Sequence, residues 1–361
     1  MKDSLFGKTK EELEEIVLEL GMKRFTADQL CDWLYRKDAR SFDEMSNISK
    51  AGRAQLAERY VVGRREHSEV SVAGDGTKKY LYPVTVPGRR PADEPQHRHV
   101  EAAYIPEEKR HTLCLSTQVG CKMGCLFCMT ARQGFQGQLS AGDVVNQLAS
   151  LPERDQITNL VYMGMGEPLD NLEAVLKSLR ILTEDWGYGM SPSRITVSTI
   201  GVVPAMRTLL EESKVHLAVS LHSPFEEERR RLMPIENVYS LYQVLGTIRE
   251  MRIDRHRRVS FEYIVFQGLN HSERHVKEIV RLVGDLRCRI NLLYFHPIPG
   301  APLEPATEAE MLTFQNALKA RGLRVTIRKS RGQDIEAACG MLSTKRLDAG
   351  QAAAEAAVAD Y

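Results

Sequence analysis

The chain has 361 residues, of which 43% are hydrophobic and 27% are charged, as is ordinary for a globular protein. Its seven cysteines are too few for a disulfide scaffold, and no apolar run is long enough to cross a membrane. A net charge of +1 does not indicate a nucleic-acid-binding protein, but local basic patches keep that possibility open. Clustered thiols without a signal peptide predict a reducing, cytoplasmic location.

The first 90 residues predict a small helical accessory domain. Helical periodicity runs over residues 10–20 and ends at Gly21, a second amphipathic helix covers 25–37, and a third lies near 50–60. Residues 80–86 predict a strand. The stretch rich in Pro, Arg and Asp that follows predicts a linker, which we place at residues 91–99.

From about residue 100 the pattern alternates between strand and helix. Repeated β–α units of this kind predict a parallel sheet with helices outside it. Too few units are present for a closed eight-fold barrel, so we expect an α/β fold with an open, partial β/α barrel over residues 100–342, followed by a flexible tail at 343–361. The expected strands are 112–118, 159–163, 194–199, 215–221, 259–266, 290–295 and 323–328, and the expected helices are 172–182, 203–212, 240–251, 273–286 and 308–321.

Three cysteines form the most informative motif, because Cys121, Cys125 and Cys128 follow a C-x3-C-x2-C spacing with no fourth cysteine nearby. Three thiolates on one loop can bind three irons of a 4Fe–4S cluster and leave the fourth iron without a protein ligand. S-adenosylmethionine (SAM) usually fills such a corner, so the spacing resembles the signature of the radical SAM superfamily. A zinc knuckle, a disulfide pair and unrelated buried thiols are the alternatives, although structural zinc prefers four ligands.

Polar motifs follow four of the predicted strands. They are the Met-Gly-Met-Gly-Glu-Pro segment at 163–168, the Ser-Thr-Ile-Gly segment at 198–201, the Ser-Leu-His segment at 220–222, and His296 after the strand at 290–295. Each is weak evidence by itself, since a turn or an ordinary buried histidine explains it. Together they lie at the carboxyl ends of successive strands, where the chemistry of such folds gathers.

The remaining thiols divide into two kinds. Cys31 and Cys288 are expected to be inert packing residues. Cys114 lies on the strand that leads into the cluster loop, and Cys339 follows the last predicted strand. Both thiols would be able to reach the mouth of the cluster site in the expected barrel.

Several segments together resemble the RlmN/Cfr family of radical SAM adenine methyltransferases, over about residues 10–342. They are residues 100–107, 110–135, 163–168, 220–222 and 328–340. The Gln-Gly-Phe sequence at 133–135 resembles the RlmN branch, whose members methylate C2 of an adenosine in 23S rRNA at the peptidyl-transferase centre and often adenosine 37 of tRNAs. The Cfr branch methylates C8 of the same rRNA base and differs at these residues.

The resemblance implies a role for each matching position. Cys339 would carry the methyl group, Cys114 would be its resolving partner, with a disulfide bond between the two after turnover, and Glu101 would accept the proton. The cluster ligands would be Cys121, Cys125 and Cys128, and the contacts to S-adenosylmethionine would come from Gly166, Glu167, Ser198, Ser220, Leu221, His222 and His296. The family often has Asn where His296 stands, so this contact departs from the pattern.

The chemistry of adenine C2 explains why such residues are needed. This carbon is electron-poor and cannot attack a SAM methyl group directly. The family uses two SAM molecules, one to methylate the cysteine and one to generate a radical that activates the S-methyl group. The resemblance therefore implies one 4Fe–4S cluster per subunit, SAM, an electron donor such as flavodoxin or ferredoxin, and 23S rRNA with tRNA as substrates.

Two alternatives remain from the sequence. One is a Cfr-like C8 methyltransferase, and the other is an iron–sulfur RNA-binding or redox-sensing protein without catalysis. The better candidates for RNA contacts lie in the accessory domain, at Arg64, Arg65 and Lys78 with Lys79. Basic clusters also occur at residues 252–258 and 329–331, where solvated surface charge is the favoured explanation.

Overall fold

The computed structural model describes residues 2–86, 95–251, 253–254 and 256–336. Its centre is one ten-stranded sheet in the order β14-β13-β12-β11-β10-β9-β6-β5-β4-β3. The strands of this sheet are β3 (Glu69–Val72), β4 (Lys78–Val86), β5 (Gln96–Glu107), β6 (Arg110–Cys114), β9 (Asn159–Tyr162), β10 (Ile195–Thr199), β11 (His216–Ser220), β12 (Val259–Val265), β13 (Cys288–Tyr294) and β14 (Val325–Ile327).

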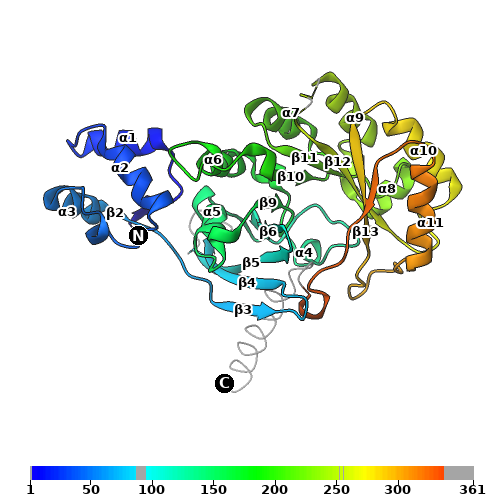
Figure 1. Cartoon of the computed structure of the whole chain (residues 1–361), viewed down its shortest axis with the longest axis horizontal. Coiled ribbons are helices and arrows are strands. Elements are labelled where there is room, and N and C mark those ends of the chain that lie inside the picture. The colour runs from blue at the N-terminus through cyan, green and yellow to red at the C-terminus, as the bar shows by residue number, and fades with distance from the viewer. Residues whose placement is uncertain (1, 87–94, 252, 255, 337–361) are drawn as a thin grey trace, which may run out of the picture.

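All neighbouring strands from β6 to β14 run parallel to one another. Strands β11 and β12 are buried along most of their length, as expected for strands covered on both faces. The sheet curls, but β14 and β3 remain separate edges, so the barrel is open (Figure 1). The predicted α/β fold with a partial barrel is therefore confirmed.

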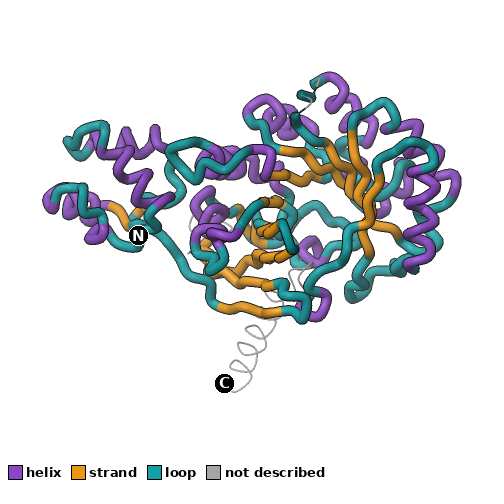
Figure 2. The backbone as a smooth tube through the Cα atoms, viewed as in Figure 1, coloured by secondary structure: helices purple, strands orange, loops and turns teal. Residues whose placement is uncertain are grey.

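Helices lie on the outer side of the curled sheet (Figure 2). Three of these helices begin directly after a residue that caps them. Ser140, Ser240 and Thr307 each cap a helix through a reciprocal capping box. The helices of this part are α4 (Met129–Arg132), α5 (Ala141–Ala149), α6 (Leu172–Thr183), α7 (Val203–Glu212), α8 (Glu226–Leu232), α9 (Leu241–Glu250), α10 (Glu273–Val283) and α11 (Glu308–Lys319). The five helices predicted in this part and all seven predicted strands are present, with ends shifted by a few residues.

Three antiparallel strands extend the parallel sheet, and the sequence predicts only one of them, at residues 80–86. Strands β3, β4 and β5 continue the sheet of the barrel beyond β6 by antiparallel pairing. The strand expected at residues 80–86 thus joins the barrel sheet as β4. Residues 96–99, expected in the linker, open β5 instead, and residues 91–94 lie outside the described residues. The division of the chain at residue 90 stays a prediction.

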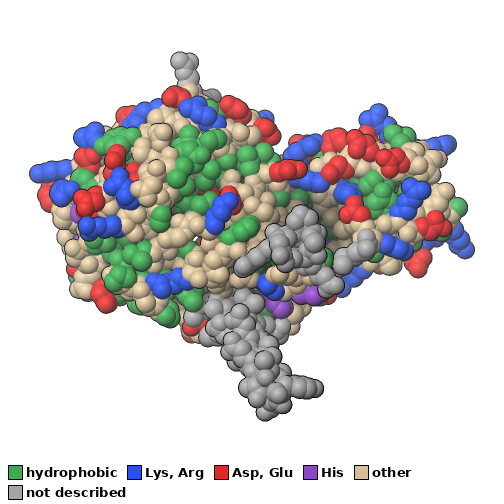
Figure 3. Space-filling view, turned by 180° about the vertical axis from the view of Figure 1, so that it is seen from behind, with side chains coloured by type: hydrophobic (Ala, Val, Ile, Leu, Met, Phe, Trp, Pro, Cys, Tyr) green, Lys and Arg blue, Asp and Glu red, His purple; other side chains and the backbone are tan. Residues whose placement is uncertain are grey.

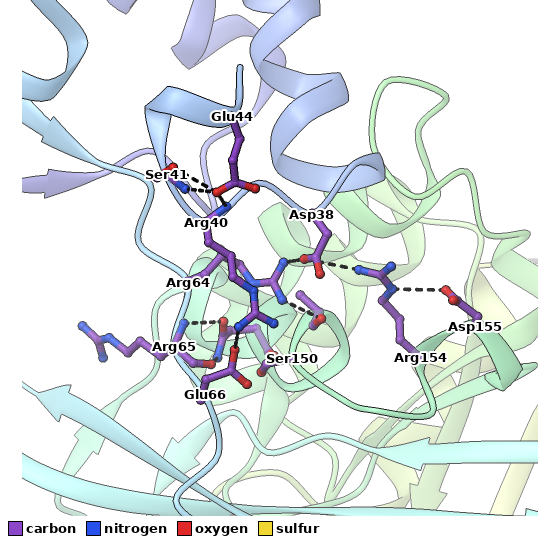
Figure 4. Close-up of polar contacts among 12 residues, drawn as sticks. Asp38, Arg40, Ser41, Glu44, Arg64, Arg65, Glu66, Ser150, Arg154 and Asp155 are labelled. Atoms are coloured by element: carbon purple, nitrogen blue, oxygen red, sulfur yellow. Dashed lines mark hydrogen bonds and ion pairs between the residues drawn. The ribbon is translucent and has the colours of Figure 1, made fainter. Parts of the chain in front are cut away.

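Helices α1 (Lys10–Glu19), α2 (Thr26–Cys31) and α3 (Lys50–Arg59) form a separate lobe, held with the short pair β1 (Asp3–Ser4) and β2 (Tyr60–Val61). Polar contacts join this lobe to the barrel (Figure 4). Arg64 and Arg154 both pair with Asp38, and the backbone N–H of Arg65 donates to Asn146 on α5. The two lobes therefore have a specific, hydrogen-bonded junction.

The loop that carries the three clustered cysteines lies between β7 (Gln118–Val119) and α4, and β7 pairs with β8 (Gly137–Gln138). Charged side chains of both signs are scattered over the barrel and the helical lobe on the face shown in Figure 3. Within the described residues, no helix combines the length and the apolar character that a membrane crossing requires.

Candidate radical SAM site

The loop after β7 has a conformation that its sequence enforces. Gly120 has a φ of +69°, and a Cβ at this position would lie 1.7 Å from the carbonyl oxygen of Gly134. The backbone N–H of Leu126 donates to the carbonyl of Leu232 at 2.9 Å and fixes the middle of the loop against the end of α8. The cysteines are thus presented on a constrained backbone.

Two of the three clustered thiols, those of Cys121 and Cys125, are buried and hard to ionise. Burial, followed by the charges of neighbouring thiolates, raises the pKa of Cys121 to about 12 and that of Cys125 well above its ordinary value. Such crowded thiols become thiolates readily only when a cation is bound to them. The site is therefore suited to a metal centre.

The donor set fits an iron–sulfur cluster better than a single ion. Among the residues that the structure describes, no three His, Cys, Asp or Glu side chains surround a common point as ligands of one metal ion would. Each thiolate of a 4Fe–4S cluster binds a different iron, so its ligands need not converge. Three thiols beside a large cavity leave room for a ligand on the fourth iron, whereas a zinc site would require a fourth protein ligand.

A cavity of about 1100 Å³ runs through the open barrel beside this loop. The cavity wall includes nearly all of the site residues predicted from the sequence: Glu101, Cys114, Cys121, Cys125, Cys128, Gly166, Glu167, Ser198, Ser220, His222 and His296. Leu221 does not belong to this wall, and its side chain is fully buried. Cys339 lies outside the described residues.

Glu167 connects two loops at the carboxyl end of the sheet. Its carboxylate accepts backbone N–H groups from Leu169 and Ile200, both at 3.1 Å. Burial raises the pKa of Glu167 to about 7, against the opposing effect of a hydrogen bond from Thr199. The side chain is thus occupied by the protein, so the backbone of this loop is left to contact a ligand's amino group.

The neighbouring glycines have a structural reason that the sequence did not reveal. A Cβ at Gly166 would lie 2.5 Å from Cβ of Gln118, and one at Gly164 would lie 2.6 Å from Oγ of Ser116. Both glycines allow the loop after β9 to pack against the segment around β7. Close packing therefore explains both glycines, apart from the SAM contact that the family resemblance implies for Gly166.

His222 is held in a defined tautomer. Its Nδ1 accepts the backbone N–H of Ile264 at 2.9 Å, so the ring proton lies on Nε2. Burial lowers the pKa of this imidazole to about 3. Phe127, between two of the clustered cysteines, packs edge-on against the ring. His222 is therefore a neutral hydrogen-bond donor beside the cluster loop.

His296 and the two serines complete the wall on the same side. Nε2 of His296 lies 3.0 Å from Oγ of Ser330, and burial lowers the pKa of the imidazole. Ser198 lies near the end of β10, and Ser220 is the last residue of β11, two adjacent parallel strands. Hydroxyl and imidazole groups in this arrangement suit the ribose and carboxylate of a nucleoside-like ligand.

Cys114 and Glu101 lie on one face of the sheet. Cys114 on β6 pairs with Ala103 on β5, and Glu101 is two residues from Ala103, so both side chains point to the cavity side. Burial raises the pKa of Cys114 to about 11, although the Met163 backbone and the positive charge of Arg328 oppose the shift. A thiol and a carboxylate thus face the cavity from adjacent strands.

The disulfide expected between Cys114 and Cys339 is not supported. All six described cysteines, including Cys114, are free. Cys339 itself belongs to the part of the chain that the structure does not describe. Cys31 is buried, and Cys288 is half-buried and lines the cavity, so the packing role expected for both stays a prediction.

Comparison with known proteins shows the family of this chain. Residues 115–283 match the model of the radical SAM superfamily, and residues 4–62 match that of the ribosomal RNA large subunit methyltransferase N-terminal domain. The chain is 51% identical to the probable dual-specificity RNA methyltransferase RlmN of Porphyromonas gingivalis, over 96% of this chain and 98% of the relative. It belongs to the RlmN family.

Other RlmN-family relatives and a solved structure agree. The dual-specificity RNA methyltransferase RlmN of Nitratiruptor is 40% identical over 93% of this chain and 96% of its own. A crystal structure of a radical SAM methyltransferase from Sphaerobacter thermophilus superposes with a TM-score of 0.84 at 37% identity, covering 94% of this chain and 98% of that one. Membership in the radical SAM superfamily implies a 4Fe–4S cluster and SAM as cofactors.

Arginines surround the opposite, amino-terminal end of the same cavity in this RlmN-family chain. Arg110 begins β6, Arg258 precedes β12, and Arg289 lies near the start of β13. Burial lowers the pKa of Arg110, and the nearby charges of Arg328 and Arg258 contribute to the shift. The amino-terminal end of the cavity is therefore lined by positive charge, which no sequence motif indicates.

Two of the residues proposed from the sequence to grip RNA are unavailable for that role. Arg64 is buried against Asp38, and Lys79 is fully buried beside Glu101. Lys78 pairs with Glu153 at 2.6 Å, and Arg65 lies 3.3 Å from Asp143. A charged residue read alone suggests a solvated surface, and only the pairing of strands and helices shows which of these charges are internal.

Proposed function

We propose that the chain is a radical SAM RNA methyltransferase that transfers a methyl group to C2 of an adenosine in 23S rRNA and of adenosine 37 in tRNAs. The observation that carries this proposal is that one cavity is lined by the three clustered thiols, by residues that we assign to SAM, and by the Cys114 thiol and the Glu101 carboxylate. Relatives named as dual-specificity RNA methyltransferases support the RNA substrates.

The cofactor end of the cavity would bind SAM. A cluster held by Cys121, Cys125 and Cys128 would supply the electron that cleaves SAM. His222 would donate from Nε2 to an acceptor of the ligand, and its neutrality avoids repulsion with the positive sulfonium. Ser198, Ser220 and His296 would bind the polar groups of the nucleoside and amino acid parts, with the backbone at Gly166 and Glu167.

The part of the cavity lined by Cys114 and Glu101 would bind the target adenine. Cys339 would receive a methyl group from a first SAM molecule and present it to adenine. Once the S-methyl group is activated and its carbon has bonded to C2, Glu101 would remove the proton from C2. Cys114 would then attack the sulfur of Cys339, so that the bond from this sulfur to the transferred carbon breaks, the carbon takes up a proton, and the bond formed between the two sulfurs is later reduced by thiol exchange. Cys114 and Glu101 point into the cavity from neighbouring strands, so one bound base has access to both.

Substrate binding requires that the target base leave its stack and enter the cavity. We place RNA contacts on exposed basic side chains of the helical lobe and of the loops around the barrel. An electron donor such as flavodoxin or ferredoxin, and a cytoplasmic location, belong to the same proposal.

Mass spectrometry of nucleosides tests this function. RNA from cells that lack the gene should gain 2-methyladenosine in 23S rRNA and in tRNA when the chain is expressed. A gain of 8-methyladenosine instead would assign the chain to Cfr-like chemistry. Failure of the reduced protein to form 5′-deoxyadenosine from SAM would instead indicate a non-catalytic iron–sulfur protein.

A further inference from the structure

A buried ammonium group lies beside the proposed proton acceptor. Nζ of Lys79 lies 3.5 Å from Oε1 of Glu101, with Lys79 side-chain exposure of 0% and Glu101 of 6%. The two residues are diagonal neighbours on β4 and β5, because Lys79 pairs with Ala103, two residues beyond Glu101. Strand pairing therefore fixes this contact.

The contact between Lys79 and Glu101 bears on whether the Glu101 carboxylate is ionised and able to accept a proton in the proposed reaction. A buried carboxylate is expected to take up a proton and become neutral unless a positive charge or several donors favour the ionised form. A neutral carboxylic acid cannot accept the proton of C2. The Lys79 ammonium lies within ion-pair distance of Glu101 and supplies such a positive charge.

Two titratable groups that line the same cavity as Glu101 do not supply a positive charge. Cys114 on β6 is a neutral thiol, because burial raises its pKa to about 11. Glu167, in the loop after β9, carries negative charge when it ionises, which opposes the ionisation of Glu101. Arg328, after β14, contacts Glu262 and Met163, so its positive charge is directed to other groups of the cavity wall.

Lys79 makes a second contact that points to the same step. Its Nζ donates to the backbone carbonyl of Glu336 at 2.6 Å. Glu336 has a φ of +52°, unusual for a residue with a side chain, and it stands three positions before Cys339 in the sequence. One side chain thus contacts both the proton acceptor and the segment that leads to the methyl-carrying cysteine.

We infer that Lys79 is a positioning residue for proton transfer, which keeps Glu101 ionised and fixes the position of its carboxylate relative to the backbone of Glu336. This inference rests on the proposed function. In the step concerned, the C2–H bond breaks, the proton moves to the Glu101 carboxylate, and the electron pair of the bond stays with the adenine ring. Lys79 does not touch the substrate and acts through Glu101.

A sensitive test measures the isotope effect at C2. RNA with deuterium or protium at C2 of the target adenosine is methylated by the reconstituted holoenzyme, and the two rates are compared. For Lys79→Gln, which removes the charge but keeps a donor for Glu336, we expect the rate to fall about tenfold or more and the isotope effect to rise. Lys79→Arg keeps the charge, so its isotope effect should stay near that of the unmodified enzyme.

Lys78→Gln is the matched control. Lys78 is the preceding residue of β4, points to the opposite face and pairs with Glu153. Its substitution should leave the isotope effect unchanged. Cluster content and 5′-deoxyadenosine formation from SAM, measured without RNA, show whether each variant is folded and loaded.

The outcomes separate this inference from the proposed function. If the unmodified enzyme does not methylate RNA, the proposed function fails. If that enzyme is active and Lys79→Gln slows without any rise in the isotope effect, or retains the full rate, Lys79 has no part in proton transfer. If Lys79→Gln loses the cluster while Lys79→Arg retains it but shows a raised isotope effect, the positive charge is not what Glu101 needs and the inference is overturned.

Discussion

The ring of Phe127 stands edge-on to the imidazole of His222, with centroids 4.7 Å apart and ring planes at 70°. Phe127 belongs to the cluster loop, and His222 follows β11, so this contact joins the two halves of the proposed SAM site. His222 also has a φ of +51°, and its carbonyl accepts a hydrogen bond from Asn270. Backbone, ring and tautomer are therefore fixed together.

The first prediction concerns pH. The pKa of His222 is lowered to about 3 in the folded protein, while the unfolded chain binds a proton near the ordinary value of 6.5. The unfolded state binds more protons below that pH, so this residue makes stability fall as the pH drops below about 6.5, by about 1.4 kcal/mol per unit. Urea unfolding at pH 7 to 5 measures the slope.

The variant His222→Asn provides the comparison for this experiment. Asn has no titrating group, so the dependence of stability on pH should become shallower by the contribution of one proton. Parallel pH profiles for the two proteins would show that His222 does not remain neutral in the fold.

The second prediction concerns the cluster ligands. Cys125→Ala should remove the 4Fe–4S cluster from anaerobically reconstituted protein, because one of three thiolates is lost. Cys288→Ala is the control, since Cys288 lies at the start of β13 and is assigned no ligand role. Iron and sulfide analysis with electron paramagnetic resonance measures the cluster. Full cluster content in Cys125→Ala, or zinc at native stoichiometry, would contradict the assignment.

The third prediction concerns a buried ion pair beside the site. Arg229 and Glu236 form an ion pair whose side chains are both fully buried. Arg229 also donates to the carbonyls of Ile200 and Ser220 at 2.8 and 3.2 Å, at the carboxyl ends of β10 and β11. Glu236→Gln would leave a buried guanidinium without its counter-charge and should cost about 3–5 kcal/mol of unfolding free energy.

A surface pair supplies the matched control for this measurement. Glu227 and Arg231 form an ion pair with side chains 77% and 75% exposed, and Glu227→Gln should change stability by about 0–1 kcal/mol. Similar losses for the two variants would show that the buried pair adds nothing to the stability of the site.

Much of the barrel was predictable because its parallel strands are short apolar runs separated by amphipathic helices. β5 was missed, since Gln96 to His99 are polar and follow a segment rich in proline and arginine. α5 was also missed, although Ser140 with Asp143 forms a capping box that a search for helix starts would have found. Local signals therefore explain both the successes and these omissions.

Contacts between distant segments were harder to predict. Lys79 was expected on the RNA-binding surface, yet it is buried through the pairing of β4 with β5 and the approach of Glu336. Arg229 lies in a highly charged helix, yet its side chain turns inward to carbonyls at the carboxyl ends of β10 and β11. Such burial depends on the tertiary fold, and no periodicity in either segment indicates it.

The fourth prediction concerns the methyl carrier. Cys339→Ala should still bind the cluster and SAM but should form no methylated RNA, because the residue is assigned only to carrying the methyl group. Incubation of the unmodified protein with methyl-labelled SAM before addition of RNA should place the label on Cys339, as peptide mass analysis would show. Label transferred directly to RNA by Cys339→Ala would rule out the two-step route.

The fifth prediction concerns Cys114, whose thiol faces the cavity from β6, on the same face of the sheet as Glu101. If Cys114 releases the product, Cys114→Ala should still methylate Cys339 and attach the methyl carbon to adenine. The bond between that carbon and the sulfur of Cys339 would then persist. We expect a covalent protein–RNA adduct that is absent from the Cys114→Ala/Cys339→Ala double variant.

A denaturing gel of labelled RNA detects this adduct, and nuclease digestion with peptide mass analysis locates it. Cys31→Ala is a suitable control, because Cys31 is buried in α2 of the helical lobe, away from the cavity wall. It should release free product. Since burial raises the pKa of Cys114 to about 11, release by the unmodified enzyme should accelerate as the pH rises toward that value, because the thiolate is the nucleophile. Normal turnover by Cys114→Ala, with free methylated RNA and no adduct, would leave Cys114 as a packing residue only.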